Sequence, residues 1–307
     1  MMRYAGQRLL GAIPVLWGVA TLVFVLLRVL PGDPAAVMLS EAGGSAAAIA
    51  RLRAELGLDD PLPVQYGRYL LNLLRGDLGT SLFTRRAVTT TIVEQLPATV
   101  ELALAAMGVA LAVGMALGVL AAARRGTWWD KLAMTLSLAG VSVPIFWSAL
   151  LLMWLLSLRL GWLPATGAGG PAYLVLPALV LGLASAGAIA RLVRASLLEV
   201  LAQDYVNTAR AKGLSEAAIL LRHALKNAMV PVVTMAGLQF GFMLGGTVVT
   251  ETIFSRPGIG RLMVNAILWQ DLPVVQGIAL LAALSYTLVN LAVDLAYAAL
   301  DPRIRYD

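Results

Sequence analysis

Long apolar runs alternate with short polar segments along most of the chain. Six of these runs contain about 20 mainly apolar residues, the length that a helix needs to cross the hydrocarbon core of a bilayer. They cover residues 9–30, 98–123, 132–157, 173–190, 229–250 and 273–300. The pattern therefore predicts an all-α polytopic membrane protein with six transmembrane helices.

Basic residues are unevenly distributed over the segments between these runs. If the N-terminus lies inside, the short outer loops keep only Arg159, Arg256 and Arg261. The inner segments then receive Arg3, Arg8, Arg124, Arg125, Lys131, Arg191, Arg194, Arg210, Lys212, Arg222, Lys226, Arg303 and Arg305. Cytoplasmic loops are enriched in Lys and Arg, so both termini are predicted to be cytoplasmic. The first run is longer than the apolar core of a signal peptide and is interpreted as a retained anchor.

Composition supports a lipid environment and excludes several kinds of chemistry. Hydrophobic residues make up 60% of the chain, charged residues 13%, and the mean hydropathy is +0.83. The net charge of +6 comes from short clusters between apolar runs, which indicates topology and not nucleic-acid binding. With no cysteine and one histidine, His223, disulfides, thiol nucleophiles and multi-histidine metal sites are excluded. We expect no catalytic, metal-binding or cofactor-binding residue in this chain.

The outer segment between the first two runs is too polar to span a membrane. Its first half predicts an amphipathic helix capped by Ser45, with Ile49, Leu52 and Leu56 on one face and Gly57 past its end. A second amphipathic helix is predicted over residues 64–74, ending at Gly76. The segment either forms a cap that meets a delivery protein or rests on the bilayer and neighbouring spans. We therefore divide the chain into an anchor at 1–30, an extracytoplasmic segment at 31–97 and a core of five spans at 98–307.

The longest inner loop, residues 193–228, differs in composition from its surroundings. Residues 193–213 predict a helix with basic residues in its last turn and Gly213 at the left-handed position that follows a helix. Residues 214–227 predict a second helix, capped by Ser215 and with Glu216 in its first turn. The small residues Ala209 and Ala211 would let another surface approach. This helix–turn–helix either docks into a groove of a cytoplasmic partner or is a solvated hairpin.

The loop resembles the EAA loop of binding-protein-dependent ATP-binding-cassette (ABC) permeases. The resemblance rests on Asp204-Tyr205, Thr208-Ala209-Arg210-Ala211-Lys212-Gly213, Leu214-Ser215-Glu216 and Arg222-His223-Ala224-Leu225-Lys226-Asn227. Asn207 and Thr208 replace the Glu-Ala of the general pattern, which is typical of the peptide subgroup. Further motifs follow in the family's order, namely Leu30-Pro31-Gly32-Asp33-Pro34, Arg75-Gly76-Asp77-Leu78-Gly79, Pro257-Gly258 with Gly260, and Asp301-Pro302-Arg303.

The resemblance implies the type I ABC importer permease fold, with the loop as the coupling helix that contacts an ATPase. The implied coupling residues are Asp204, Tyr205, Thr208, Ala209, Arg210, Ala211, Lys212, Gly213, Leu214, Ser215 and Glu216. The implied partners are a second homologous permease subunit forming a heterodimer, two ATPase subunits and an extracytoplasmic substrate-binding protein. ATP and Mg²⁺ would bind the ATPase subunits, because this chain carries no glycine-lysine phosphate-binding motif.

Within the predicted spans, ionisable residues are scarce and lie near the ends, at Arg28, Glu101 and Asp294. No proton relay is visible, which argues against ion-coupled transport. Pro144 and Pro177 are positions where helices can bend. A possible gate or translocation path in the fifth span consists of Gln239, Gly245, Gly246, Thr247, Thr250 and Glu251. The alternative is that this stretch serves ordinary helix packing.

Together these features predict a multi-pass protein of the cytoplasmic (inner) membrane, the pore-forming permease subunit of an ABC importer of dipeptides or oligopeptides. Similar permeases carry nickel chelates, glutathione or oligosaccharides, and these cargoes remain alternatives. A passive channel or ion-coupled carrier is a further alternative, which the long inner loop disfavours. An intramembrane enzyme would need a nucleophile beside a base, and His223 lies in the inner loop, far in depth from any serine of the spans.

Overall fold

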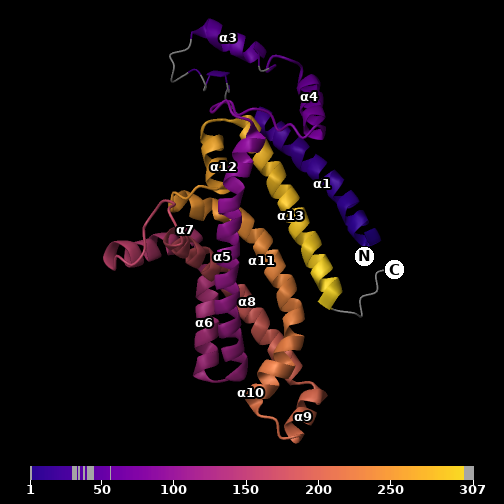
Figure 1. Ribbon diagram of the computed structural model, residues 1–307, viewed down its shortest axis with the longest axis vertical. Helices are drawn as coiled ribbons and strands as arrows, with labels where there is room; N and C mark the ends of the chain where they lie inside the picture. The colour runs from indigo at the N-terminus through magenta and orange to yellow at the C-terminus, as the bar shows by residue number, and fades with distance from the viewer. Residues whose placement is uncertain are drawn as a thin grey trace. The chain divides into compact units, whose positions relative to one another are not determined.

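The computed structural model describes residues 2–29, 33, 35, 36, 39, 45–55 and 57–300, with side chains except those of 2–7, 9 and 294–300. Its named elements are helical (Figure 1). They are α1 Met2–Val29, α3 Ala46–Glu55, α4 Leu62–Leu74, α5 Val88–Ala123, α6 Trp128–Ser142, α7 Ile145–Leu152, the π-helix η1 Met153–Arg159, α8 Ala172–Leu201, α9 Asp204–Ala211, α10 Glu216–Ala218, the π-helix η2 Ile219–Ala224, α11 Leu225–Ile253, α12 Ile259–Leu268 and α13 Leu272–Leu300.

The helices that correspond to the apolar runs confirm an all-α, multi-pass architecture. In the described part of the chain, five helices are long and apolar enough to cross a membrane, and a bent pair makes six if it is one crossing. Several helices extend beyond the apolar run that predicted them: α5 begins at Val88 and α8 ends at Leu201. The predicted turn at 31–34 lies largely outside the described residues, and so do Leu56, Arg303 and Arg305.

The third predicted span is not the single continuous helix expected over residues 132–157. It is broken between α6 and α7, whose axes differ by 105°. Val143 has an extended backbone with ψ 126°, because the ring of a following proline disfavours helical geometry in the preceding residue. Pro144 is the N-cap of α7, which begins at Ile145 and continues into η1. The bend expected at Pro144 is therefore present, whereas α8 runs through Pro177 without ending.

Both predicted outer helices are present. Ser45 caps α3, where its Oγ accepts a hydrogen bond from the Ala48 amide at 3.3 Å. Helix α4 ends before Gly76, which has a φ of +74°, a conformation that glycine adopts without strain. The sequence pattern missed Gln65, which is buried on α4, and the short helix α12 in the segment between the fifth and sixth spans.

The chain forms two compact units that are interleaved along the sequence. One contains Met1–Ala5, Val100–Arg256 and Tyr286–Asp307, and the other contains Gly6–Thr99 and Pro257–Ser285. The division of the chain into segments at residues 30 and 97 stays a prediction. Each unit has its own apolar core, described below.

Helix α8 is at the centre of the first unit. Its buried side chains, Leu181, Ile189, Val193 and Leu197 among them, share one apolar core with residues of α5 and α11. Glycines bring the α5 and α8 backbones together, since a Cβ atom on Gly118 would lie 2.6 Å from the Ala190 carbonyl oxygen. Gly182 of α8 meets α5 in the same way. Small residues at such seams let membrane helices approach closely.

The second unit is built around α1, α3, α4, α12, the first third of α5 and the first half of α13. Val88 and Ile92 of α5 pack with Val274 and Ile278 of α13 in its core. Asp271 ties down the segment before α5, because its carboxylate accepts hydrogen bonds from the Ser81 hydroxyl at 2.5 Å and the Leu82 amide at 3.0 Å. The rings of Phe83 and Trp269 stack beside this tie with centroids 4.3 Å apart.

Candidate functional site

The predicted docking loop forms a compact hairpin, defined here as residues 202–224. It contains α9, a turn at Gly213, α10 and η2 (Figure 1). The single helix expected over residues 193–213 is wrong, because α8 ends at Leu201 and the chain passes through Ala202 and the extended Gln203 before α9 begins. Asp204 occupies the first turn of α9, where a negative charge is favourable.

A small apolar core holds the two arms of the hairpin together. Val206 and Ala209 of α9 are buried against Ile219 of η2, with Leu201 of α8 packed beside them. Ala209 therefore faces into the hairpin and cannot provide the close approach to a partner that its small size suggested. Ala211, its neighbour on the exposed side, remains available for that contact.

The turn between the arms is a Schellman motif. The Gly213 amide donates to the Arg210 carbonyl at 2.9 Å, and the Leu214 amide donates to the Ala209 carbonyl at 3.3 Å. Gly213 has a φ of +81°, and a Cβ there would meet no atom within 4 Å. The conformation alone requires glycine at this position, as the sequence predicted.

Polar contacts fix the geometry on both sides of this turn. The Ser215 Oγ accepts a hydrogen bond from the Ala218 amide at 3.4 Å, which confirms Ser215 as the cap. Arg210 and Glu216 form an ion pair across the turn at 2.7 Å, and the Glu216 carboxylate raises the pKa of Arg210. At the base of the hairpin, Asn227 donates to the Tyr205 hydroxyl at 2.8 Å. Because exposed ion pairs contribute little stability, these contacts mainly set the shape of the hairpin.

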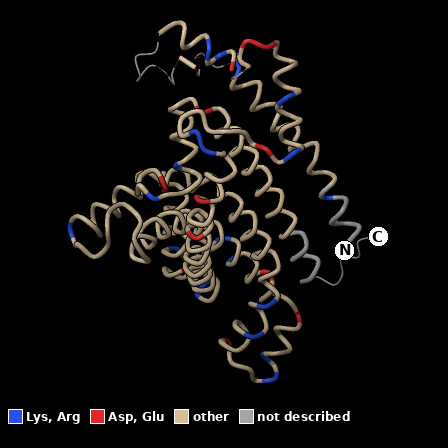
Figure 2. Tube along the Cα trace, turned by 45° about the horizontal axis from the view of Figure 1, so that its top comes forward, with Lys and Arg blue, Asp and Glu red and all other residues tan. Residues whose placement is uncertain are grey.

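The outer surface of the hairpin is polar and basic. Figure 2 shows Lys and Arg gathered on the hairpin and on the adjoining start of α11, where the sequence has Arg210, Lys212, Arg222 and Lys226. Most of the predicted coupling residues lie exposed on this surface, and the exception is Ala209. They are Asp204, Tyr205, Thr208, Arg210, Ala211, Lys212, Gly213, Leu214, Ser215 and Glu216. The hairpin therefore presents a compact, charged surface to whatever lies beside it.

A cavity of about 610 Å³ opens between this hairpin and the ends of α5 and α8. Arg124, Arg125 and Arg210 line it together with Glu216 and apolar residues that include Leu198. Three cations against one carboxylate give the cavity a positive charge.

The second arm of the hairpin continues into the fifth span without a loop. Helix α10 passes into η2, and η2 passes into α11 at Leu225. In a π-helix the amide bonds to the carbonyl five residues earlier, and such segments are rare and often lie at functional sites. The second arm of the hairpin and α11 are thus joined by continuous helical backbone.

A charged clamp fixes the other helices next to the hairpin, and the sequence analysis missed it. Arg194 of α8 binds Asp130 of α6 through two hydrogen bonds, at 2.7 Å to Oδ1 and 2.8 Å to Oδ2. The Gly126 amide donates to the same carboxylate at 3.0 Å. Asp130 is the single acidic residue between Arg125 and Arg191 in the sequence. An isolated carboxylate between basic residues was the signal from which this ion pair could have been predicted.

The residues proposed to form a gate lie on α11. Thr247, Thr250 and Glu251 are fully buried within the chain, Gln239 is half-buried and Gly245 is exposed. Gly246 packs against Leu181 of α8. The structure thus places these residues along one helix without an open path between them, and their role stays a prediction.

Glu101, one of the few ionisable residues of the spans, pairs with the buried Arg256. Arg256 was predicted to lie in an outer loop, 155 residues from Glu101 along the chain, and local sequence patterns do not reveal a pairing over that separation. This pair supports the interpretation of Glu101 as a structural partner of a neighbouring segment.

The fold and the hairpin together define a multi-pass membrane protein with an exposed, largely polar hairpin between two of its spans. The chain belongs to the family described as the binding-protein-dependent transport system inner membrane component, whose model matches residues 114–306. The model for the N-terminal part of the same kind of membrane component matches residues 1–103. The chain is therefore an importer permease of the inner membrane.

Curated relatives match the chain over its whole length. It is 48% identical to the glutathione transport system permease protein GsiC of Salmonella paratyphi A over 306 residues, covering 100% of both chains. Identity is 47% to the protein of that name from Pectobacterium atrosepticum and 46% to that from Escherichia coli K12, again covering 100% of both chains.

Solved structures share the fold. An inward-facing structure of the MetNI methionine ABC transporter matches with a TM-score of 0.60 at 19% identity, covering 69% of this chain and 97% of that chain. An amino acid ABC transporter with histidines matches with a TM-score of 0.51 at 16% identity, covering 70% of this chain and 95% of that chain. These likenesses confirm the expected fold of ABC importer permeases.

Proposed function

We propose that the chain is one of two related permease subunits in an ATP-driven importer, and that its hairpin receives the motion of an ATPase subunit. The full assembly would contain a second permease, two ATPase subunits that bind ATP and Mg²⁺, and an extracytoplasmic substrate-binding protein. The observation that carries this proposal is the hairpin itself, a compact and exposed element with its own apolar core that continues into α11 without a loop.

The hairpin is connected to the membrane helices in a way that suits alternating access. When the ATPase subunits close, they would displace the surface around Gly213, and η2 would carry the displacement into α11. Helix α8 packs against both α5 and α11, so these helices would move together. Rocking of such a packed body between inward-open and outward-open states is a common transport transition.

The polar stretch of α11 is the proposed gate. Thr247, Thr250 and Glu251 are buried in the described state, as expected if they face other helices when the path is closed. In the outward-open or inward-open state, separation of α11 from its neighbours would expose these three residues together with Gln239 and Gly246, next to Gly245, which is already exposed.

Coupling is tested by Gly213→Asp in the assembled transporter, because an aspartate would strain the left-handed turn and add a charge at the centre of the docking surface. We expect uptake to fall by about tenfold or more, as when about 1.4 kcal/mol of a required interaction is lost. Gly76→Asp is the matched control, since Gly76 also has a positive φ, +74°, and open space around it. Uptake at the wild-type rate by Gly213→Asp, with ATPase subunits still bound, would show that the hairpin does not couple.

The substrate class is a small peptide, and the names of the relatives make glutathione the first candidate. Proteoliposomes containing the transporter should accumulate labelled glutathione or a dipeptide only with internal ATP and an external binding protein. Nickel chelates and oligosaccharides serve as competitors in the same assay. Uptake without ATP would instead identify a passive channel or an ion-coupled carrier, and uptake of a non-peptide competitor alone would exclude a peptide importer.

A further inference from the structure

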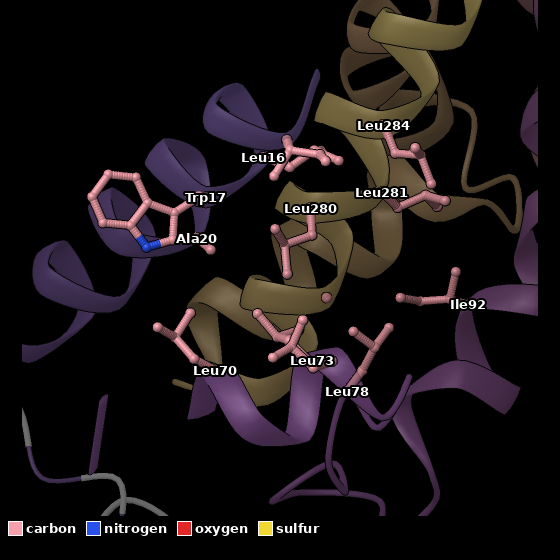
Figure 3. A pocket seen from close by; sticks show the side chains of 13 residues that line it. Leu16, Trp17, Ala20, Leu70, Leu73, Leu78, Ile92, Leu280, Leu281 and Leu284 are labelled. Atoms are coloured by element: carbon pink, nitrogen blue, oxygen red, sulfur yellow. The ribbon is translucent and has the colours of Figure 1, made fainter. Parts of the chain in front are cut away.

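An apolar groove runs between α1 and α13 in the second compact unit. It has a volume of about 540 Å³, within the range of ligand pockets. Figure 3 shows Leu16 and Ala20 of α1 opposite Leu280 of α13, with Leu70 and Leu73 of α4 at one end. All of its lining side chains are apolar apart from the indole nitrogen of Trp17.

A smaller, polar cavity of about 160 Å³ adjoins this groove. The same helices line both cavities with residues one turn apart, and Leu78 lines both. On α1, Ala20 lines the groove and Phe24 lines the polar cavity. The corresponding residues are Leu73 and Tyr69 on α4, and Leu280 and Gln276 on α13. The two cavities therefore form one elongated site with an apolar end and a polar end.

The polar end contains a cation, Arg28, without an anionic partner and a hydrogen-bond donor, the Tyr69 hydroxyl, without an acceptor in the described part of the chain. Arg28 donates to the Gln65 amide oxygen at 2.9 Å and lies over the Phe24 ring at 5.0 Å, but it forms no ion pair with any described residue. The buried hydroxyl of Tyr69 has no hydrogen-bond partner in the described part of the chain. Burial raises the pKa of Tyr69 to about 12, further above neutral pH than that of an ordinary tyrosine, and the protonated hydroxyl can donate a hydrogen bond.

The other charges in the polar lining are already engaged. Arg68 pairs with Asp60 at 2.8 Å, and the Asp77 carboxylate accepts the Gly79 amide at 2.8 Å. Gln65 is held by the Leu58 and Asp60 carbonyl oxygens, to which its amide donates at 3.1 and 2.8 Å. Arg28 and Tyr69 are thus the cation and the hydroxyl that remain to recognise a ligand, beside the side-chain amides of Asn72 and Gln276 in the same lining, and both favour an anionic oxygen.

We propose that this site binds a glycerophospholipid, with the phosphate at Arg28 and Tyr69 and an acyl chain in the groove between α1 and α13. One molecule then supplies an anion for the cation, an acceptor for the hydroxyl and an apolar chain for the groove. A transmembrane helix of another subunit could cover the groove, but it would also need an acidic side chain at the depth of Arg28 to meet the polar end. The polar end lies at the end of α1 that is predicted to be outside, so the lipid belongs to the outer leaflet.

The test uses the assembled transporter in nanodiscs of phosphatidylethanolamine and phosphatidylglycerol, followed by detergent extraction, washing and mass spectrometry of retained phospholipid. Arg28→Gln removes the cation, and Leu280→Trp fills the groove. Their matched controls are Arg75→Gln and Ala282→Trp, at exposed positions of the same unit that line neither cavity.

We expect the wild type and both controls to retain a phospholipid on each chain. The amount of phospholipid retained by the two site variants should be about tenfold lower. Equal retention by all five proteins, or none by the wild type, would overturn the proposal. So would retention by the isolated chain but not by the assembled transporter, because a helix of a partner subunit would then fill the groove. If Leu280→Trp does not assemble, Leu16→Trp fills the groove from its opposite wall.

Discussion

Glycines at two positions have different physical requirements. Gly213 is required for its backbone conformation and has open space around it. Gly118 lies within α5, where any side chain would collide with the carbonyl oxygen of Ala190. Conformation limits the first residue and volume limits the second, so the two tolerate different substitutions.

The substitution Gly118→Ala tests the volume requirement. A Cβ there would lie 2.6 Å from the Ala190 oxygen, so α5 and α8 must separate, and we expect a loss of about 1–3 kcal/mol of stability. Gly108→Ala in the same helix is the control, because Gly108 is exposed and has no atom within 4 Å of its Cβ position. There alanine should be neutral or stabilising by up to about 1 kcal/mol. Thermal unfolding in detergent measures both, and equal midpoints would contradict the tight seam.

Residue-scale features were predictable where neighbours in sequence determine them. Gly213 and Ser215 follow from local turn and capping chemistry, and the structure confirms their geometry. The pairing of Arg194 with Asp130 joins residues 64 apart, and that of Arg256 with Glu101 joins residues 155 apart. Such pairings depend on how the helices pack, which hydropathy does not encode.

At the scale of elements, apolar length placed the membrane helices but not their breaks. It did not show that the third span bends by 105° or that α8 ends before the hairpin. It also missed α12, whose ten residues are too few to cross a bilayer. Pro144 signalled a bend, but its size depends on what α6 and α7 pack against.

The side chain of Asp271 holds the segment before α5, and its removal tests how much the order of that segment depends on it. Asp271→Ala removes the acceptor for Ser81 and Leu82, so we expect trypsin to cleave after the exposed Arg85 or Arg86 about tenfold faster. Asp59→Ala is the control, because that carboxylate is exposed and pairs with Arg53 in another part of the outer segment. Cleavage at the same rate in both variants would show that Asp271 does not hold the segment.

The whole molecule offers a clean test of topology, because the chain contains no cysteine. With six crossings and both termini inside, Asp59→Cys and Ala168→Cys should react with an impermeant maleimide from outside. Lys212→Cys should react only after permeabilisation. Labelling of Ala168→Cys from inside alone would mean that the bent pair of α6 and α7 does not cross the membrane.

The exposed position of His223 on η2 gives the protein a built-in reporter. It is the single histidine of the 307-residue chain, so its ring contributes one set of imidazole signals to a proton NMR spectrum. Composition alone assigns those signals, without a resonance-by-resonance experiment. Because the ring lies in the second arm of the hairpin, docking of another protein there becomes visible in the unmodified chain.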